Sequence, residues 1–133
     1  MDEITVRVET EINPTEAEEK VQKAVVNVFG NLSTEIKSSY KRSVLYAEAK
    51  SQEALVKFRN LLRSDRIRDA ARKVLFQGVR GTTVSFCLNK QVAFAGHVSF
   101  SEEVDESPLG PIRVTIECEN SRELIDWLAS RTA

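Results

Sequence analysis

The stretch that decides the fold is residues 4–30, "ITVRVETEINPTEAEEKVQKAVVNVFG". Over its first nine residues apolar and polar side chains alternate, so that Ile4, Val6 and Val8 fall on one side of an extended chain. Side chains of a strand point to opposite faces in turn, and this alternation is typical of a strand with one buried face. The sequence therefore predicts a half-buried strand near the start of the chain.

An amphipathic helix is predicted to follow this strand. Asn13 has the character of an N-cap, with Pro14 at the first helical position and Glu16 three residues after the cap. Beyond them, apolar residues recur at helical spacing as far as Gly30, a residue type that commonly ends helices. These apolar residues are Ala17, Val21, Ala24, Val25 and Val28.

The other predicted elements mix strands and helices without a strict alternation. We expect strands at residues 34–40, 43–49 and 112–119, and a final helix capped by Asn120 or Ser121. Such a mixture favours an α+β fold with one mostly antiparallel sheet and helices packed on a face. The length of the chain suits a single domain, so residues 1–133 are predicted to fold as one unit.

A helix break is predicted in the middle of the chain. Ser51 is placed to cap a helix whose last apolar residue is Leu62, and the next apolar stripe begins at Ile67. This step of five residues corresponds to about 500° of helical rotation, which misaligns the two stripes by roughly 140°. One straight helix cannot bury both stripes. We therefore predict a break at Ser64-Asp65, with one of these two residues capping the second helix.

Residues 82–88 and 92–100 are predicted to form a hairpin. A three-residue loop, Asn89-Lys90-Gln91, would place Phe86 opposite Phe94 and gather the apolar side chains on one face, whereas a two-residue turn would mix the faces. The other face would be small, and a helix of this chain is expected to pack on it. Its residues would be Ser85, Cys87, Ala93 and Ala95.

Charge is divided unequally along the chain. The net charge is −1, yet residues 37–90 hold thirteen lysines and arginines against four acidic residues, a balance of +9. The rest holds six against sixteen, a balance of −10. Such asymmetry indicates contact with nucleic acid or with an acidic partner.

Three absences from the sequence indicate the compartment in which the protein works. The sequence has no long apolar run and no signal-peptide pattern, and its two cysteines, Cys87 and Cys118, lack the spacing of a zinc site or a disulfide framework. We expect a cytoplasmic protein that does not enter a membrane.

Four segments together resemble a known family. The segments "RIRDAARKVL", "FCLNKQVAFAGHVSF", "LGPIRVTIE" and "ELIDWLA" occur in this order and spacing in an archaeal family of uncharacterised proteins. Its members are described as predicted RNA-binding proteins or predicted exosome subunits. Their fold is related to that of the large-subunit ribosomal protein that binds 5S ribosomal RNA. The resemblance implies an α+β fold and an RNA partner, and it supplies no catalytic residues.

The basic residues between positions 57 and 80 are the main candidates for RNA contact. Arginine binds phosphate through its planar fork of donors, and several arginines near a helix break could follow a phosphate backbone. Arg59, Arg63 and Arg66 would align if the first helix continued past Ser64. The alternative is a solvated helix face. The candidates are Lys57, Arg59, Arg63, Arg66, Arg68, Arg72, Lys73 and Arg80.

A metal or acid/base site is less favoured. His97 is the one histidine of the chain, and Glu102 and Asp105 follow it closely, but metal sites usually combine at least two His or Cys ligands. The hairpin would turn His97 away from Phe94, and the carboxylates would lie in a solvated loop. No nucleotide-binding or nucleophile motif is present. We expect no catalytic residues, metal or cofactor.

Exposed aromatic rings could add base stacking to phosphate contact. Phe58, Phe86, Phe94 and Phe100 are predicted to lie in the core, while Tyr40 and Tyr46 are better placed for exposure.

The preferred hypothesis is a non-enzymatic domain that binds structured RNA, alone or within an RNA-processing or ribosomal complex, through its basic middle segment. The alternative is a protein-interaction module, such as a homodimer held by the divided charge. A hydrolase or nuclease that uses the acidic loop is the least favoured hypothesis.

Overall fold

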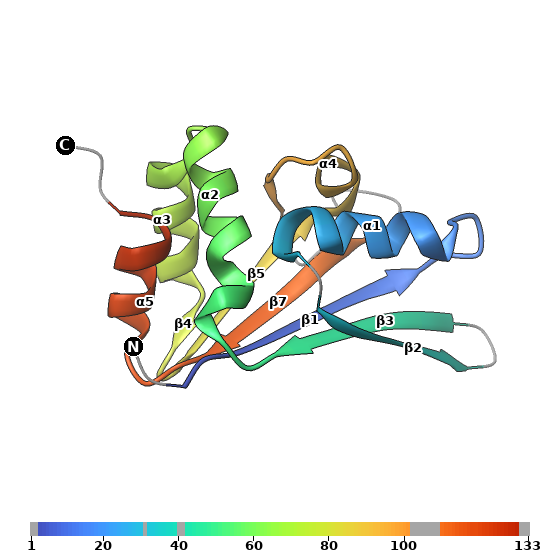
Figure 1. Ribbon diagram of the computed structural model, residues 1–133, viewed down its shortest axis with the longest axis horizontal. Coiled ribbons are helices and arrows are strands. Elements are labelled where there is room, and N and C mark those ends of the chain that lie inside the picture. The colour runs from blue at the N-terminus through green and yellow to red at the C-terminus, as the bar shows by residue number, and fades with distance from the viewer. Residues whose placement is uncertain (1–2, 31, 40–41, 102–109, 131–133) are drawn as a thin grey trace.

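The helices cover one face of a single antiparallel sheet. The computed structural model describes residues 3–30, 32–39, 42–101 and 110–130. Within these ranges seven strands form a sheet of order β2-β3-β1-β7-β5-β4, with β6 also paired to β5 (Figure 1). The predicted α+β fold, with helices packed on a face of a mostly antiparallel sheet, is confirmed.

The first strand lies in the middle of the sheet. The strands are β1 (Thr5–Ile12), β2 (Ser33–Ser39), β3 (Arg42–Ala49), β4 (Val79–Arg80), β5 (Thr83–Asn89), β6 (Phe100–Ser101) and β7 (Pro111–Glu117). β1 pairs with β3 and with β7, so that Val8 has Ala47 on one side and Val114 on the other. Val6 and Val8 are buried and Arg7 between them is exposed, which confirms the predicted half-buried strand.

The helices are α1 (Glu18–Phe29), the 3-10 turn η1 (Gln52–Leu55), α2 (Val56–Ser64), α3 (Arg68–Gln77), α4 (Lys90–Phe94) and α5 (Ser121–Leu128). The caps predicted at two helix ends are confirmed. Gly30 ends α1 with a positive φ of 77°, and the Asn120 side chain accepts a hydrogen bond from the Glu123 N–H at 2.9 Å.

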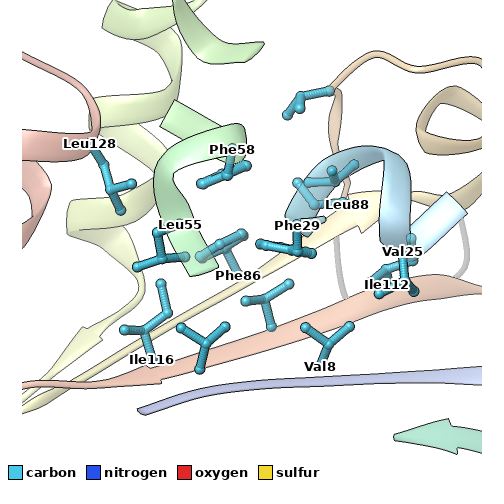
Figure 2. Packing of buried hydrophobic residues seen from close by; sticks show 14 of the residues in the cluster. Val8, Val25, Phe29, Leu55, Phe58, Phe86, Leu88, Ile112, Ile116 and Leu128 are labelled. Atoms are coloured by element: carbon cyan, nitrogen blue, oxygen red, sulfur yellow. The ribbon is translucent and has the colours of Figure 1, made fainter. Parts of the chain in front are cut away.

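The core lies between the sheet and the helices, around Phe58 of α2. Its ring stacks on Phe86 of β5 with centroids 5.4 Å apart, and it lies 5.5 Å from Phe29 of α1 (Figure 2). Phe100 approaches the same ring edge-on at 6.4 Å. Aromatic pairs at such distances stabilise a core beyond the area that they bury. These contacts confirm the core positions predicted for Phe58, Phe86 and Phe100.

The start of the first helix differs from the prediction. Asn13 and Pro14 form a turn before the helix, and α1 begins only at Glu18, because Ala17 has an extended backbone. The Asn13 backbone and side-chain N–H groups both donate to Glu16 Oε1, at 3.0 and 2.8 Å. The same carboxylate pairs with Lys90, so Glu16 anchors the turn to a distant element instead of capping a helix.

The predicted break between α2 and α3 is confirmed, but its predicted cap is wrong. α3 begins after Ile67 with no side-chain cap, and Asp65 turns toward the segment that follows α4. Arg66, which would align with Arg59 and Arg63 only if the first helix continued past Ser64, lies beyond the end of α2 with a positive φ of 56°, as the predicted break implies.

The predicted hairpin after β5 is wrong. The Asn89 side chain accepts a hydrogen bond from the Val92 N–H at 3.0 Å and so caps α4 where a second long strand was expected. β5 is paired instead by β7 and by the short β6. Phe94 is therefore 40% exposed on a helix, not buried opposite Phe86.

The end of α3 borders the small face of β5, where a helix was expected to pack. Phe86 and Leu88 point into the core, and Ser85 and Cys87 point the other way, where they line one surface hollow with Val74 and Gln77 of α3. Ala93 is buried within α4, and Ala95 follows that helix.

Candidate nucleic-acid interface

The basic middle of the chain folds into a group of helices at one end of the sheet. α2 and α3 run in opposite directions and meet at the break around Asp65, and α5 packs against both (Figure 1). We call the turn at residues 63–67 the α2–α3 corner.

Two of the predicted RNA contacts bind α5 instead. Arg59 Nε donates to the Trp127 carbonyl oxygen at 2.8 Å, and its guanidinium lies 5.1 Å from the centre of the Trp127 ring. Arg72 Nη1 lies 2.6 Å from Asp126 Oδ1 and donates to the Ala129 carbonyl oxygen at 3.3 Å. Both arginines are half-buried, and their donors satisfy the last turn of α5.

Three more candidates also make contacts within the molecule. Lys57 Nζ donates to the Val26 carbonyl oxygen at 3.1 Å, and Arg68 Nη1 donates to Ser130 Oγ at 3.2 Å. Arg80 Nη1 donates to the Val79 carbonyl oxygen at 2.7 Å. These three cations bind oxygen atoms within the fold, whereas the alternative to RNA contact that the sequence suggested was a solvated helix face.

Arg63, Arg66 and Lys73 remain available for a partner. All three are exposed, and within the described residues their side chains form no hydrogen bond or ion pair. Arg63 and Arg66 are neighbours at the α2–α3 corner, where the Arg66 N–H donates to the Arg63 carbonyl oxygen at 3.1 Å. We call these three residues the free cations.

Asp65 forms no ion pair with the free cations, because its carboxylate oxygens bind elsewhere. It accepts a hydrogen bond from the Val98 N–H at 2.9 Å and lies 3.0 Å from His97 Nδ1. Burial would raise the pKa of Asp65, but the Val98 N–H and the His97 ring outweigh burial and hold this pKa below its usual value. Asp65 is therefore a structural anion at neutral pH.

His97 has a structural partner in Asp65. In the part of the chain that the structure describes, no group of three or more histidines, cysteines or acidic residues could hold a metal ion. Glu102 and Asp105, which the sequence places near His97, lie outside the described residues.

The uncovered face of the sheet is rich in carboxylates. The alternation of the strands places Glu9, Glu11, Glu35, Glu48 and Glu117 on this face. Arg7 lies among them and contacts Glu48 at 3.4 Å and Glu117 at 2.6 Å, so its charge is already balanced. A phosphate backbone is repelled by such a surface and attracted by the helical end.

Three aromatic rings are exposed near cations: Tyr46, Phe76 and Phe94. The exposure predicted for Tyr46 is confirmed, while Tyr40 lies outside the described residues. Phe76 was missed by the sequence analysis, although its spacing of four residues from Arg72 on a helix is a signal that could have identified it.

The fold and the charges define a class of small α+β domain with a one-sided helical layer and cations at its helical end. The family model that matches residues 5–118 is described as RNA binding. The chain is 47% identical over 128 residues to the UPF0201 protein of Sulfurisphaera tokodaii, covering 95% of this chain and 87% of that relative. The chain belongs to this archaeal UPF0201 family, and so to the family whose model bears the RNA-binding description.

Solved structures agree with the fold. A UPF0201 protein from Methanococcus jannaschii is similar with a TM-score of 0.85 and 32% identity, over 97% of this chain and 95% of that chain. Another UPF0201 crystal structure has a TM-score of 0.80 at 37% identity, with 96% and 94% covered. Among the described helices, none is long and apolar enough to cross a membrane.

Proposed function

We propose that the protein binds structured RNA without catalysing a reaction on it, and that the free cations, two at the α2–α3 corner and Lys73 on α3, contact RNA phosphates. The observation that carries the proposal is which of the basic residues already have partners within the molecule. Five of the eight candidates hold the fold together, and Arg63, Arg66 and Lys73 extend from the same helices without a partner among the described residues. The RNA-binding description of the family model supports the same class of ligand.

The distribution of charge supports this helical end over the sheet as the RNA surface. Phosphate contact supplies most of the affinity for nucleic acid, and it requires cations that are not already paired. Two arginines lie on the sheet face: Arg7 is bound to two glutamates, and Arg113 also has a contact within the molecule. Arg63 and Arg66, in contrast, have no side-chain hydrogen bond or ion pair among the described residues. The approach of a phosphate backbone is therefore favoured at the corner.

The test compares two variants of equal charge change on a base-paired RNA hairpin. R63E/R66E/K73E reverses the free cations, and K37E/K50E/R122E reverses three exposed cations elsewhere. We expect the first variant to lose at least about 100-fold in affinity, because three phosphate contacts are replaced by repulsion. The RNA affinity of the second variant should stay within a few-fold of that of the unmodified protein. Equal losses in both would mean that only net charge matters and would overturn the proposed surface.

The proposal extends to association with an RNA-processing or ribosomal complex in the cytoplasm. The likeness to the 5S-rRNA-binding ribosomal protein stays a prediction, and it makes a ribosomal RNA stem a sensible first probe. Affinity capture from an archaeal lysate, with and without ribonuclease, tests the association. Partners that disappear after ribonuclease treatment support RNA contact, whereas partners that persist point to direct protein contacts.

A protein-interaction module is the second candidate, and the uncovered sheet face favours it. This face carries both Arg7 and glutamates, so that two copies could pair through opposite charges. Sizing of the purified protein at low and high salt tests this candidate. A dimer that forms at low salt, dissociates at high salt and does not bind RNA would replace the RNA proposal.

A further inference from the structure

A pocket opens between α1 and the turn that carries α4. Its volume is about 360 Å³, which suits a flat ring of nucleobase size. Val21 and Ala24 of α1, with Ala17 just before the helix, form one wall, and Phe94 of α4 forms part of the other. The walls are therefore apolar and aromatic, although the pocket lies on the protein surface.

The floor of the pocket is polar but electrically balanced. Lys90 is buried, and its Nζ donates to the Glu11 carbonyl oxygen at 2.7 Å and to Glu16 Oε1 at 3.0 Å. Because the Lys90 ammonium is already paired with a carboxylate, the floor does not attract a phosphate. A neutral ring with polar edges matches this floor and these walls better than an anion does.

The exposed ring of the pocket lies near two cations, of which Lys20 lines the pocket and Lys23 lies outside its lining. Lys20 Nζ and Lys23 Nζ lie 5.9 and 5.5 Å from the centre of the Phe94 ring, and both lysines are exposed. The Asn27 side chain donates to the carbonyl oxygens of Ala93 and Phe94, at 3.1 and 3.0 Å. These hydrogen bonds fix the end of α4 on α1, so Phe94 is held in place before any ligand arrives.

The other exposed rings are less suited to binding a base. Arg72 covers Phe76 at 5.0 Å and is itself tied to Asp126, so this ring face is already occupied. Tyr46 lies on the glutamate-rich face of the sheet. Lys20 and Lys23 form no hydrogen bond or ion pair within the described residues, and they can move from the ring to a phosphate.

We propose that the α1–α4 pocket binds one unpaired RNA base, stacked on Phe94, with Lys20 and Lys23 against the flanking phosphates. This inference rests on the proposed function, to which it adds a preference for RNA with an unpaired nucleotide. Aromatic side chains stack on any base, so the site selects for an unpaired base and not for its identity.

The test compares two RNA hairpins that differ only by a single bulged nucleotide. We expect the unmodified protein to bind the bulged hairpin about tenfold more tightly than the fully paired one, as one stacked base allows. Phe94→Ala should abolish this preference, and Phe94→Leu should do the same because it keeps apolar bulk but lacks an aromatic face. Phe76→Ala serves as the control and should retain the preference.

The outcomes separate this inference from the proposed function. If R63E/R66E/K73E weakens binding to both hairpins by the same factor and keeps the preference, the two surfaces act independently, as expected. If the unmodified protein binds both hairpins equally, or Phe94→Ala keeps the preference, the pocket does not bind a base although RNA binding stands. If the unmodified protein binds neither hairpin, both proposals fail.

Discussion

Asp65 joins two segments that are 32 residues apart in the chain. Its hydrogen bonds to Val98 and His97 hold the segment after α4 against the α2–α3 corner, and they leave the neighbouring arginines free. The half-buried carboxylate of Asp65 thus holds these segments together without pairing with the cations of the candidate RNA surface.

Asp65→Asn should therefore destabilise the protein by about 1–2 kcal/mol at neutral pH, because the amide accepts the Val98 hydrogen bond more weakly than a carboxylate does. The pKa of Asp65 is lowered on folding, so its stabilising contribution is present above the usual value of 3.8 and is lost as the pH falls through the lower folded value. Urea unfolding at neutral pH and at about pH 2 measures both effects.

The matched control for Asp65 is Glu53→Gln, which alters an exposed carboxylate in η1. It should change the free energy of unfolding by less than about 0.5 kcal/mol. The assigned role of Asp65 would be contradicted if Asp65→Asn lowered the free energy of unfolding by the same amount at both pH values.

Lys90, which is buried, and Glu16, which is half-buried, form an ion pair whose partners depend on each other. Lys90→Met keeps most of the side-chain volume but leaves Glu16 without its cation. We expect a loss of about 3 kcal/mol in the free energy of unfolding, near the low end for a broken buried pair, because Asn13 still donates to Glu16. The double variant K90M/E16Q should recover part of this loss. A double variant as unstable as the sum of the single ones would show that the pair is not coupled.

For individual residues, the sequence shows which side chains are charged, but it does not show which of them form contacts within the fold. Arg59 and Arg72 bind carbonyl oxygens that lie 68 and 57 residues further along the chain. Such distant partners depend on the tertiary packing of α5, which local spacing cannot supply. The exposure of Phe94 was missed for a related reason, since it depends on α4 being a helix.

Among the elements, the junction between α3 and the β4–β5 hairpin has the strictest requirement for a particular residue. A Cβ atom on Gly78 would overlap the backbone carbonyl oxygen of Ser85. The Ser85 N–H also donates to the Gly78 carbonyl oxygen at 3.1 Å, so the two backbones are held close together. This close approach positions α3, and with it Lys73, over the edge of the sheet.

Gly78→Ala should reduce the free energy of unfolding by at least about 3 kcal/mol, because the backbones of α3 and β5 must separate. Gly81→Ala is the control in the same hairpin. Gly81 has a φ of 62° and open space around it, so its substitution should cost only about 1 kcal/mol of backbone strain. Urea denaturation of both variants provides the comparison, and similar losses would argue against close packing at Gly78.

Long periodic elements could be predicted from the sequence, and short ones could not. β1 and β7 alternate over their whole length, and the misaligned stripes of α2 and α3 located the break between them. α4 spans Lys90–Phe94 only, too short for a helical period to stand out, and its apolar residues also suit a strand. The cap supplied by Asn89 and the burial of Lys90 decide in favour of the helix.

On the scale of the whole molecule, the division of charge along the sequence becomes a division in space. Glutamates lie on the uncovered face of the sheet, and the free cations lie on the helical layer. The sequence predicted that the basic segment would matter, but five of its eight candidate residues serve the fold. The part of the prediction that remains open is the role of Arg63, Arg66 and Lys73.

The salt dependence of RNA affinity tests this central claim most directly, because each phosphate contact adds a fixed share to the slope of log affinity against log salt concentration. The measurement compares the unmodified protein with R63Q/R66Q/K73Q on one structured RNA over a range of salt concentrations. We predict a steep slope for the unmodified protein and a reduction of about two to three in the variant. Equal slopes for the two proteins would contradict phosphate contact by the free cations.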